Sequence, residues 1–281
     1  MRAAAVIESA THDHRSRRGT RELALFAAAY LTYFGVRALT QGAVPNAISN
    51  AVGVMHLERI LGIDVEDSVQ DVVAGSHTLV DAANALYIWG HWPLLIVGGV
   101  LLFHLAPEHY YRLRNVCLLS GAFGLVVFAL FPVAPPRLAP SGLVDTITLH
   151  ARAYRTVLPA SLVNEYAAMP SFHAGWNLIL GVELFRATRN VALRAFAIAM
   201  PVAMAFAVVA TANHYVLDVL AGALAVSLAL LVVTGIERRR RPSTVGTDAR
   251  PEHAVPRRPS GRQRRGHAAP RGGAARPARR G

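Results

Sequence analysis

The stretch Asn213-His214-Tyr215-Val216-Leu217-Asp218 begins an apolar run over residues 213–236, and this run decides the class of fold. The run is about as long as the roughly 20 residues that a helix needs to cross a bilayer. His214 and Asp218 are four residues apart, so a helix places them on one face. Ionisable side chains at the edge of an apolar run are costly and usually mark a working site. The stretch therefore predicts a membrane helix that carries a reactive histidine at its start.

Two further motifs place polar side chains at the edges of other apolar runs. His173 follows Met169-Pro170-Ser171-Phe172, and Arg137 follows Pro135-Pro136. An imidazole held by a carboxylate can act as a base or a nucleophile. A guanidinium can grip two phosphoryl oxygens through its planar fork. Two histidines, one aspartate and one arginine therefore predict chemistry on a phosphate group.

Apolar residues make up 53% of the chain and charged residues only 16%, whereas soluble domains have about 25% charged residues. The apolar residues gather in six runs of membrane-spanning length. These are 23–40, 80–104, 113–133, 170–187, 190–211 and 213–236. The alternative, that the runs are buried helices of a soluble protein, is disfavoured because so many rarely occur in a water-soluble fold. The sequence predicts an all-α, polytopic membrane protein with six transmembrane helices.

Arginine supplies all 29 basic residues, and its distribution predicts the orientation in the membrane. Arginines gather at the N-terminus, after the second and fourth runs, and in the C-terminal tail. Six spans place these segments on one side, which the positive-inside rule makes cytoplasmic. The polar first 21 residues do not resemble a cleavable signal peptide. We expect a multi-pass protein of the cell membrane, with both termini in the cytoplasm and with Arg137, His173 and His214 together at the outer face.

The chain divides into three parts by composition. Residues 1–21 are expected to form a disordered cytoplasmic N-terminus, and residues 22–236 the six-helix membrane domain. Residues 237–281 are rich in Arg, Pro, Gly and Ala, which predicts a disordered cytoplasmic tail. A basic segment beside a membrane helix attracts anionic lipid. Nucleic-acid binding is not expected, because no aromatic residues are interleaved to stack on bases.

Two long segments on the expected outer side border the motifs. In 41–79, apolar residues recur at helical spacing with acidic residues between them, which predicts amphipathic helices at the membrane interface. The second loop, 134–169, contains Arg152 and Arg155, and its 143–162 stretch is a candidate for a short helix over the site. Loops of this length are often functional.

The local chemistry of the motifs is consistent with phosphoryl transfer. The proline before Ser171 suits the first position of a helix. The backbone N–H groups of Ser171, Phe172 and His173 would then bind phosphate, with the Ser171 hydroxyl as a further donor. We expect His214 to attack phosphorus and form a phosphohistidine, while Asp218 accepts its Nδ1–H. His173 would protonate the departing alkoxide and then take a proton from water or an acceptor alcohol.

These motifs resemble those of the type 2 phosphatidic acid phosphatase superfamily, which has an Arg-containing first motif, a Pro-Ser-x-His second motif and a His-x-x-x-Asp third motif. The matching stretches are Pro135 to Arg137, Pro170 to His173 and His214 to Asp218, in the same order. The resemblance implies a six-helix membrane fold and phosphoryl transfer that needs no metal or other cofactor. It also implies that His214 is the nucleophile and Asp218 its partner. His173 would be the acid and base, and Arg137 the phosphate ligand.

The sequence departs from the superfamily pattern at two cations. A lysine seven residues before the arginine of the first motif is replaced by Leu130, and a Ser-Arg pair before the third motif by Ala207 and Val208. The Pro-Pro-Arg, Ser-Phe-His and Asn-His-Tyr forms are more similar to the inositol phosphorylceramide synthase branch, an inositolphosphotransferase-like group. The segments 57–63 and 87–93 are similar to bacterial members of that branch. Candidates to replace the missing cations or to contact the substrate are Arg152, Arg155, His91, Tyr87 and Tyr215.

The residues leave three classes of function open. The favoured one is a lipid phosphatase or phosphotransferase, and the motifs do not decide between water and an alcohol as acceptor. The second is a metal-dependent membrane hydrolase with His173, His214, Asp218 and His91 as ligands. The third is a non-enzymatic protein that binds or transports lipid, although the paired repeats typical of transporters are not evident.

Overall fold

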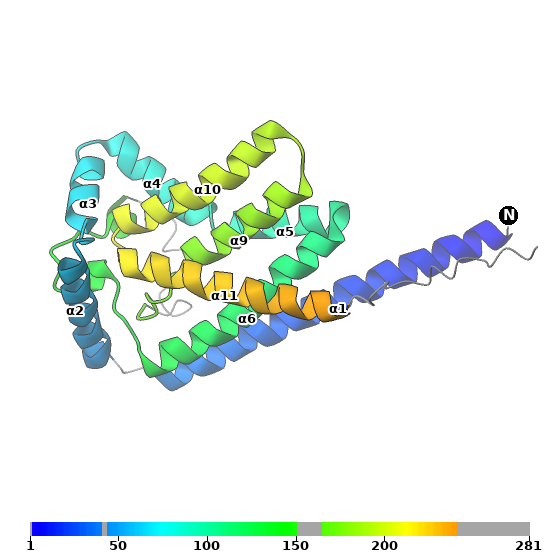
Figure 1. Ribbon diagram of the computed structural model, residues 1–281, viewed down its shortest axis with the longest axis horizontal. Coiled ribbons are helices and arrows are strands. Elements are labelled where there is room, and N and C mark those ends of the chain that lie inside the picture. Colours follow the sequence, from blue (N-terminus) through cyan, green and yellow to red (C-terminus); the bar gives the residue numbers. More distant parts are fainter. Residues whose placement is uncertain (1, 41–43, 151–164, 241–281) are drawn as a thin grey trace, which may run out of the picture. The chain divides into compact units, whose positions relative to one another are not determined.

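The computed structural model describes residues 2–40, 44–150 and 165–240, and these residues form helices joined by short loops (Figure 1). The helices are α1 (Arg2–Thr40), α2 (Val44–Leu61), α3 (Glu66–Ala74), α4 (His77–Trp89), α5 (Trp92–Leu105), α6 (Pro107–Leu130), the 3-10 turn η1 (Pro136–Leu138), α7 (Thr146–His150), α9 (Phe172–Ala187), α10 (Val191–Ala210) and α11 (Val216–Arg240). Within the described ranges, β-type pairing is limited to an isolated bridge between Val133 and Ala167. The all-α class predicted from the sequence is confirmed.

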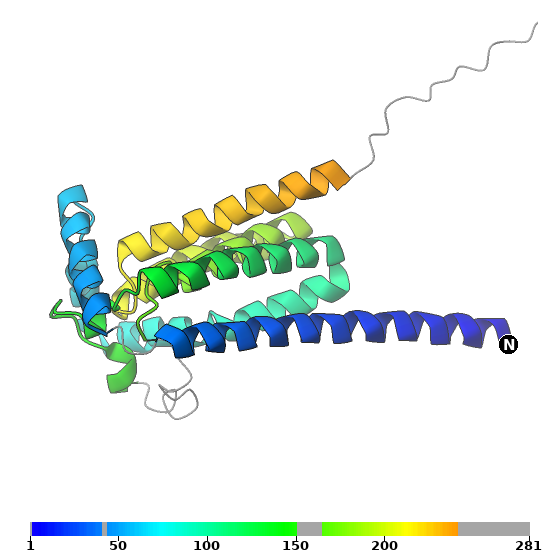
Figure 2. The same ribbon diagram turned by 90° about the horizontal axis from the view of Figure 1, so that it is seen from below.

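Helix α9 lies at the centre of the bundle, where it contacts α5, α6, α10 and α11 (Figures 1 and 2). Its glycines allow two of these neighbours to approach closely. A Cβ on Gly181 would lie 2.3 Å from the carbonyl oxygen of Ala197 on α10. A Cβ on Gly175 would lie 2.7 Å from the carbonyl oxygen of Gly222 on α11. Small residues permit this close packing in membrane helices, and it fixes the position of α9 within the bundle.

The number of membrane spans is a correction to the sequence-based prediction. Helices α6, α10 and α11 are each long and apolar enough to cross a membrane. Helices α4 and α5 meet that condition together, as a pair bent by 47°. The described residues therefore carry three or four candidate spans, whereas six were predicted. The predicted span 170–187 is the 16-residue α9, which is shorter than the roughly 20 residues needed to cross, and the predicted span 23–40 is not among the candidates.

The outward faces of the candidate spans fit a lipid environment. Leu130 on α6 and Val191 on α10 are each 80% exposed, and Leu231 on α11 is 67% exposed. Large exposed apolar surfaces are rare on soluble monomers and mark contact with membrane or partner. The chain is therefore a membrane protein, as predicted.

Helix α1 contains both the N-terminal segment and the first apolar run, which the sequence analysis assigned to two different parts of the chain. The backbone from Arg2 to Arg21, expected to be disordered, is helical and continuous with the apolar segment 23–40. Alanine runs at 3–5 and 27–29 favour a helix by intrinsic propensity. The apolar half is fixed against α6, because Glu22 accepts a 3.0 Å hydrogen bond from the Tyr110 hydroxyl and pairs with Arg114. The tail from residue 241 lies outside the described residues.

A network of buried charges joins three helices at the end of the bundle where α9 finishes. The Glu183 side chain is fully buried, and its carboxylate lies 2.7 Å from His109 Nδ1 and 3.2 Å from an Arg112 nitrogen. Arg112 also binds Glu237 at 3.0 Å, and Arg186 lies 3.3 Å from Glu183. Glu183 is ten residues after His173, or about 15 Å along the helix. The arginines of this end are therefore remote from the second motif.

Helices α2 and α3 lie outside the bundle, at the end where α11 begins (Figures 1 and 2). Both fall in the segment 41–79, for which the sequence predicted amphipathic helices. Leu57 and Ile60 on α2 and Val72 on α3 expose 46%, 67% and 67% of their surface, whereas Val54 and Val73 are buried. Each helix thus has a buried and an exposed apolar face, and their place at the membrane interface stays a prediction.

Candidate functional site

The turn between α10 and α11 carries the third motif. The backbone N–H groups of Asn213 and His214 both donate to the carbonyl of Val208 at 3.0 Å, which folds the turn back against the end of α10. Ala212 has a φ of 54°, in the left-handed region that non-glycine residues rarely adopt. The turn therefore presents His214 immediately before α11, with the side chain only 8% exposed.

The Nδ1 atom of His214 has two acceptors. It lies 2.9 Å from the carbonyl oxygen of Ala168 and 3.4 Å from Oδ2 of Asp218. A carbonyl oxygen can only accept, so Nδ1 carries the proton and Nε2 keeps its lone pair. The sequence predicted Asp218 as the acceptor, but the shorter contact is to the Ala168 backbone. Both acceptors favour the tautomer that leaves Nε2 free to attack.

His214 is electrically neutral over a wide pH range. The pKa of His214 is lowered from its ordinary 6.5 to about 4, chiefly by burial and also by the nearby Arg137 guanidinium, against the raising effect of the Ala168 carbonyl. At neutral pH the imidazole is therefore unprotonated at Nε2. A neutral imidazole is the form that can act as a nucleophile.

We predict that His214 titrates near pH 4 rather than near pH 6.5. Because the pKa of the folded state is lowered to about 4, the neutral nucleophile persists as the pH falls, and the acid limb of kcat/KM that belongs to His214 lies near pH 4. The measurement is a pH profile of kcat/KM together with an NMR titration of the histidine ring, assigned by its loss in His214→Gln. An assigned pKa at or above 6.5 would contradict the prediction.

His173 in the first turn of α9 faces His214, as the motif order predicted. The two ring centroids are 5.6 Å apart. The His173 ring contacts two others, with the Tyr87 ring stacked at 4.4 Å and the His91 ring tilted at 4.1 Å. Tyr87 comes from the end of α4, and His91 from the break between α4 and α5. Two of the candidate substrate contacts thus lie against His173, where they hold its ring.

His91 is buried among aromatic rings and keeps one unsatisfied nitrogen. Its ring also contacts Trp92 at 5.1 Å and Trp176 at 6.0 Å. Within the described residues, His91 Nδ1 has no hydrogen-bond partner. A buried polar atom without a partner is costly, and a contact of His91 with substrate stays a prediction.

Arg137 in η1 is held by the same turn that carries His214. Its backbone N–H donates to the Ala212 carbonyl at 3.0 Å, and its Nε donates to Oδ1 of Asn213 at 3.0 Å. Asp145 lies 3.7 Å from Nε. Among the described residues, Arg137 Nη1 is buried and has no acceptor. The guanidinium is thus fixed on one side and keeps a free donor for an anion.

Asn213 is a site residue that the sequence analysis missed as a positioning group. Its side-chain nitrogen donates to the carbonyl and the hydroxyl of Thr211, each at 3.0 Å, which leaves Oδ1 for Arg137. Its position beside His214 in the Asn-His-Tyr form was the available signal. The carbonyl of Ala168 had no such signal, because every residue has one.

The second motif is placed differently from the prediction in one respect. The Ser171 N–H, expected to bind phosphate, donates to the carbonyl of Asp218 at 2.9 Å, and the buried Ser171 hydroxyl accepts from Ala174 N as the cap of α9. A helix leaves its first N–H groups without intrahelical partners, and the phosphate-binding role of Phe172 and His173 stays a prediction. The Phe172 side chain packs on Trp176 and on Gly124 of α6. Ser171 therefore joins α9 to α11.

Short backbone bonds join the first motif to the second. The N–H of Val133 donates to the Tyr166 carbonyl at 3.0 Å, and the N–H of Ala168 donates to the Val133 carbonyl at 3.1 Å. The loop before Arg137 and the loop before His173 are thus paired beside the turn of His214. The structure brings Arg137, His173, His214 and Asp218 into one group.

Of the remaining candidates to replace the missing cations, Tyr215 is the one that the structure describes. Arg152 and Arg155 lie outside the described residues. Tyr215 is 1% exposed and packs in a core with Ala51 and Val54 of α2. Burial raises the pKa of the Tyr215 hydroxyl, and the carboxylates of Asp218, Glu58 and Glu66 raise it further. A hydroxyl among carboxylates is not placed to bind a phosphate.

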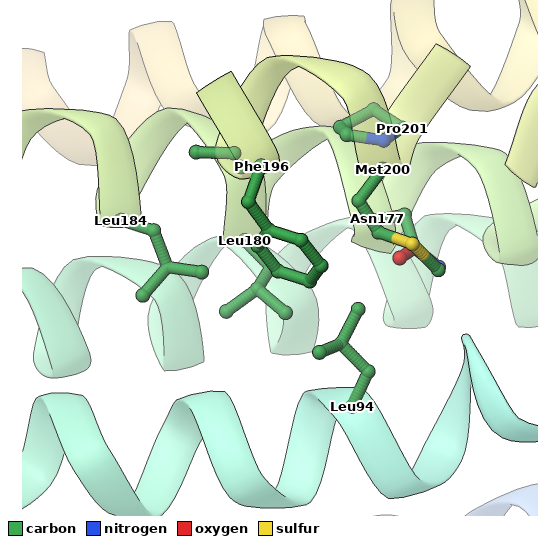
Figure 3. Close-up of a pocket in the computed structure, with 9 residues that line it drawn as sticks. Leu94, Asn177, Leu180, Leu184, Phe196, Met200 and Pro201 are labelled. Carbon is green, nitrogen blue, oxygen red and sulfur yellow. The ribbon is translucent and has the colours of Figure 1, made fainter. Parts of the chain in front are cut away.

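A small space lies between α5, α9 and α10, with Asn177 on its border (Figure 3). It has no room for a water molecule. The residues around it are Leu94, Asn177, Leu180, Gly181, Leu184, Phe196, Ala197, Met200 and Pro201. Asn177 donates to the His173 carbonyl at 2.8 Å. This space is a feature of helix packing, and the chemistry belongs to the group around His214.

Gly222 allows the second and third motifs to meet. A Cβ at this position would lie 2.1 Å from the carbonyl oxygen of Ser171 and 2.9 Å from its carbonyl carbon. These are backbone atoms, so a side chain there forces α11 away from the start of α9. The hydrogen bond from Ser171 N to the Asp218 carbonyl depends on this approach.

We predict that Gly222→Ala reduces turnover by about 100-fold, because a displacement near 1 Å between His173 and His214 disturbs the attack geometry. The measurement is kcat in detergent or vesicles, normalised to folded protein. Gly235→Ala, on the same helix with nothing within 4 Å of the added Cβ, is the matched control. Equal kcat for Gly222→Ala and Gly235→Ala would show that the close approach does not matter.

The fold and the site define a helical membrane enzyme that acts on phosphate groups. The family model described as the PAP2 superfamily matches residues 52–232. This range covers more than half of the chain, and the chain belongs to the PAP2 superfamily. Membership makes it a phosphatase or phosphotransferase, as the motifs predicted. No curated protein and no solved structure matches the chain.

Proposed function

We propose that the chain cleaves or transfers the phosphoester of a membrane lipid at the outer face of the cell membrane, through a phosphohistidine on His214 and without a metal ion. The observation that carries the proposal is the state of His214. Its Nδ1–H is held by the Ala168 carbonyl and Asp218, so its Nε2 keeps the lone pair that a nucleophile needs. Arg137 with an unpaired Nη1 and His173 at 5.6 Å complete the group.

In the first step, His214 Nε2 attacks phosphorus and the P–O bond to the lipid alkoxide breaks. His173 donates a proton to that oxygen, which leaves as an alcohol. The phosphorylated imidazole carries positive charge, which the Asp218 carboxylate at 3.4 Å and the Ala168 carbonyl stabilise. In the second step, His173 takes a proton from water or an alcohol whose oxygen attacks phosphorus, and the P–N bond breaks to restore His214.

The phosphoryl oxygens would bind two kinds of donor. One is Arg137 Nη1, and the other is the pair of N–H groups of Phe172 and His173 at the start of α9, where the helix dipole favours an anion. With Leu130 and Val208 in place of the superfamily's Lys and Arg, fewer cations suit a less charged phosphate. We therefore favour a phosphodiester head group, and transfer of the type found in the inositolphosphotransferase-like branch.

The charge distribution supports an outward-facing site. Arg112, Arg114 and Arg186 lie at the end of the bundle remote from His214, in ion pairs with Glu183, Glu22 and Glu237. An excess of arginine marks the cytoplasmic side. Both termini would then be cytoplasmic, and the basic tail would contact anionic lipid.

The test is the product list from purified protein incubated with phosphatidic acid, isoprenyl pyrophosphate or phosphatidylinositol, each with and without an acceptor lipid alcohol. Free phosphate or phosphoinositol indicates hydrolysis, and a new phospholipid indicates transfer. Full activity with a chelator is expected, because the proposed nucleophile, acid and phosphate ligand are side chains of the protein. Loss of activity with the chelator would favour the metal-dependent hydrolase. No change in any lipid would favour the lipid-binding or transport protein.

A further inference from the structure

The first turn of α11 is capped by three carboxyl groups from three helices. The N–H of Tyr215 donates to Asp218 Oδ2 at 2.9 Å, within the same helix. The N–H of Val216 donates to Glu66 Oε1 at 3.0 Å, and the N–H of Leu217 donates to Glu58 Oε1 at 2.7 Å. These N–H groups have no partners inside a helix, and a carboxylate near a helix N-terminus is stabilising. The caps therefore hold the turn that follows His214.

Two of the three caps come from outside the bundle. Glu58 lies near the end of α2, and Glu66 is the first residue of α3. They are 1% and 7% exposed, although glutamate is rarely buried unless it is paired. Nothing in the proposed chemistry uses either of them. Their burial therefore needs a structural or positional explanation.

The two glutamates form a carboxyl pair. The pKa of Glu58 is raised to about 8, chiefly by burial and also by the Glu66 and Asp218 carboxylates and a hydrogen bond with Glu66, against the lowering effect of the Leu217 N–H. Glu58 thus keeps its proton at neutral pH and shares it with Glu66, as two close carboxyls do. Each still offers one oxygen to the start of α11.

The same two helices also hold the loops of the first motif. Asn50 on α2 donates to the Pro132 carbonyl at 2.8 Å, and the N–H of Ala134 donates to the Ala47 carbonyl at 3.0 Å. Gln70 on α3 donates to the Val144 carbonyl at 2.9 Å and accepts from its N–H at 2.8 Å. Helices α2 and α3 therefore contact both the Arg137 loop and the first turn of α11.

We propose that Glu58 and Glu66 are positioning residues for the phosphoryl-transfer site, which fix the first turn of α11 so that His214 and Asp218 face His173 and Arg137. The inference rests on the proposed function for its kinetic consequence. Its structural consequence, the protection of the Val216 and Leu217 N–H groups, does not depend on that function.

The experiment compares Glu58→Ala, Glu58→Gln, Glu66→Ala and Asp67→Ala in the full-length protein in phosphatidylinositol-containing vesicles. Asp67 is exposed and adjacent to Glu66 on α3, so it is the matched control. The readouts are kcat and KM from pH 6 to about pH 9 and hydrogen exchange of the segment 215–217.

We expect Glu58→Ala and Glu66→Ala to lower kcat by about 100-fold, since catalysis of this kind is lost when groups shift by about 1 Å, with KM little changed and exchange of 215–217 accelerated. Glu58→Gln keeps an acceptor for Leu217 and a donor for Glu66, so it should retain both kcat and protection. Wild-type kcat should fall above pH 8, because Glu58 loses its proton there. Its negative charge then faces Glu66 of α3 and Asp218 and Tyr215 of α11. Glu58→Gln should lack this limb.

Several outcomes would overturn the inference. One is wild-type kcat and protection in folded Glu58→Ala; another is a loss in Asp67→Ala as large as that in Glu66→Ala. If the alanine variants do not fold, an alkaline limb that persists unchanged in Glu58→Gln decides against it. If the wild-type protein turns over no lipid, the proposed function fails, and the exchange of 215–217 alone decides the positioning role.

Discussion

His214→Ala is expected to abolish turnover, with a loss of about 10⁶-fold in kcat. Removing the nucleophile of a covalent mechanism removes nearly all of the rate enhancement that the catalytic side chains provide together. The wild-type protein should acquire label from a ³²P-phospholipid when the reaction is quenched at alkaline pH, at which phosphohistidine is stable. The His214→Ala variant should acquire none. The measurement is single-turnover labelling of the protein together with steady-state release of product.

His104 provides a matched control for this substitution. It lies exposed near the end of α5, at the other end of the bundle from the site. His104→Ala should therefore be labelled and should turn over like the wild type. Labelling of folded His214→Ala at the wild-type level would show that the covalent bond forms on another residue, and it would contradict the assignment of His214 as the nucleophile.

The class of fold and the central group of side chains could be predicted from the sequence for physical reasons. Apolar runs report burial in lipid or in a core, and polar groups at their edges are too costly to occur there by accident. Arg137, His173, His214 and Asp218 all satisfied that condition. The reactivity of these side chains follows from their residue type, so their type and order in the sequence were enough to predict phosphate chemistry.

The number of spans could not be predicted in the same way. Composition records how apolar a run is, but not where its helix breaks. The run 80–104 divides at Gly90 and His91 and bends by 47°, and the break directs His91 against His173 at 4.1 Å. The run 170–187 likewise forms only the 16-residue α9, because composition does not report where a helix begins or ends. A break in a membrane helix is tolerated when surrounding protein satisfies its backbone.

The contacts that orient the site side chains could not be predicted from the sequence, for a different reason. The acceptor nearest to His214 Nδ1 is a backbone carbonyl, and no side-chain pattern identifies one. Glu58 and Glu66 bind α11 from 159 and 150 residues away in the chain. Their acidic character was visible in the sequence, but it fits an amphipathic surface helix equally well. Tertiary contacts of this kind form between segments that are distant in the chain, so the local sequence pattern does not predict them.

His173→Ala is expected to lower kcat by 10² to about 10⁴-fold on a lipid with an alkoxide leaving group, because general acid catalysis supplies about that much. The loss should be much smaller on a 4-nitrophenyl phosphodiester. Its leaving group is a weak base that departs without a proton, so His173 has little to contribute to that bond cleavage. The measurement is the ratio of phosphoenzyme formation rates for the two substrates in wild type and variant.

The stacked rings around His173 make a second variant necessary. Removing its imidazole leaves a gap beside Tyr87 and His91, which lie 4.4 Å and 4.1 Å from its centroid, and the gap could disturb the site as a whole. His173→Phe keeps an aromatic ring in this place but cannot donate a proton, so it should show the same selective loss on the alkoxide substrate. If His173→Ala slows both substrates by the same factor, His173 only shapes the site. A selective loss on the alkoxide substrate is explained by proton transfer to the departing oxygen, and a general disturbance of packing does not produce that selectivity.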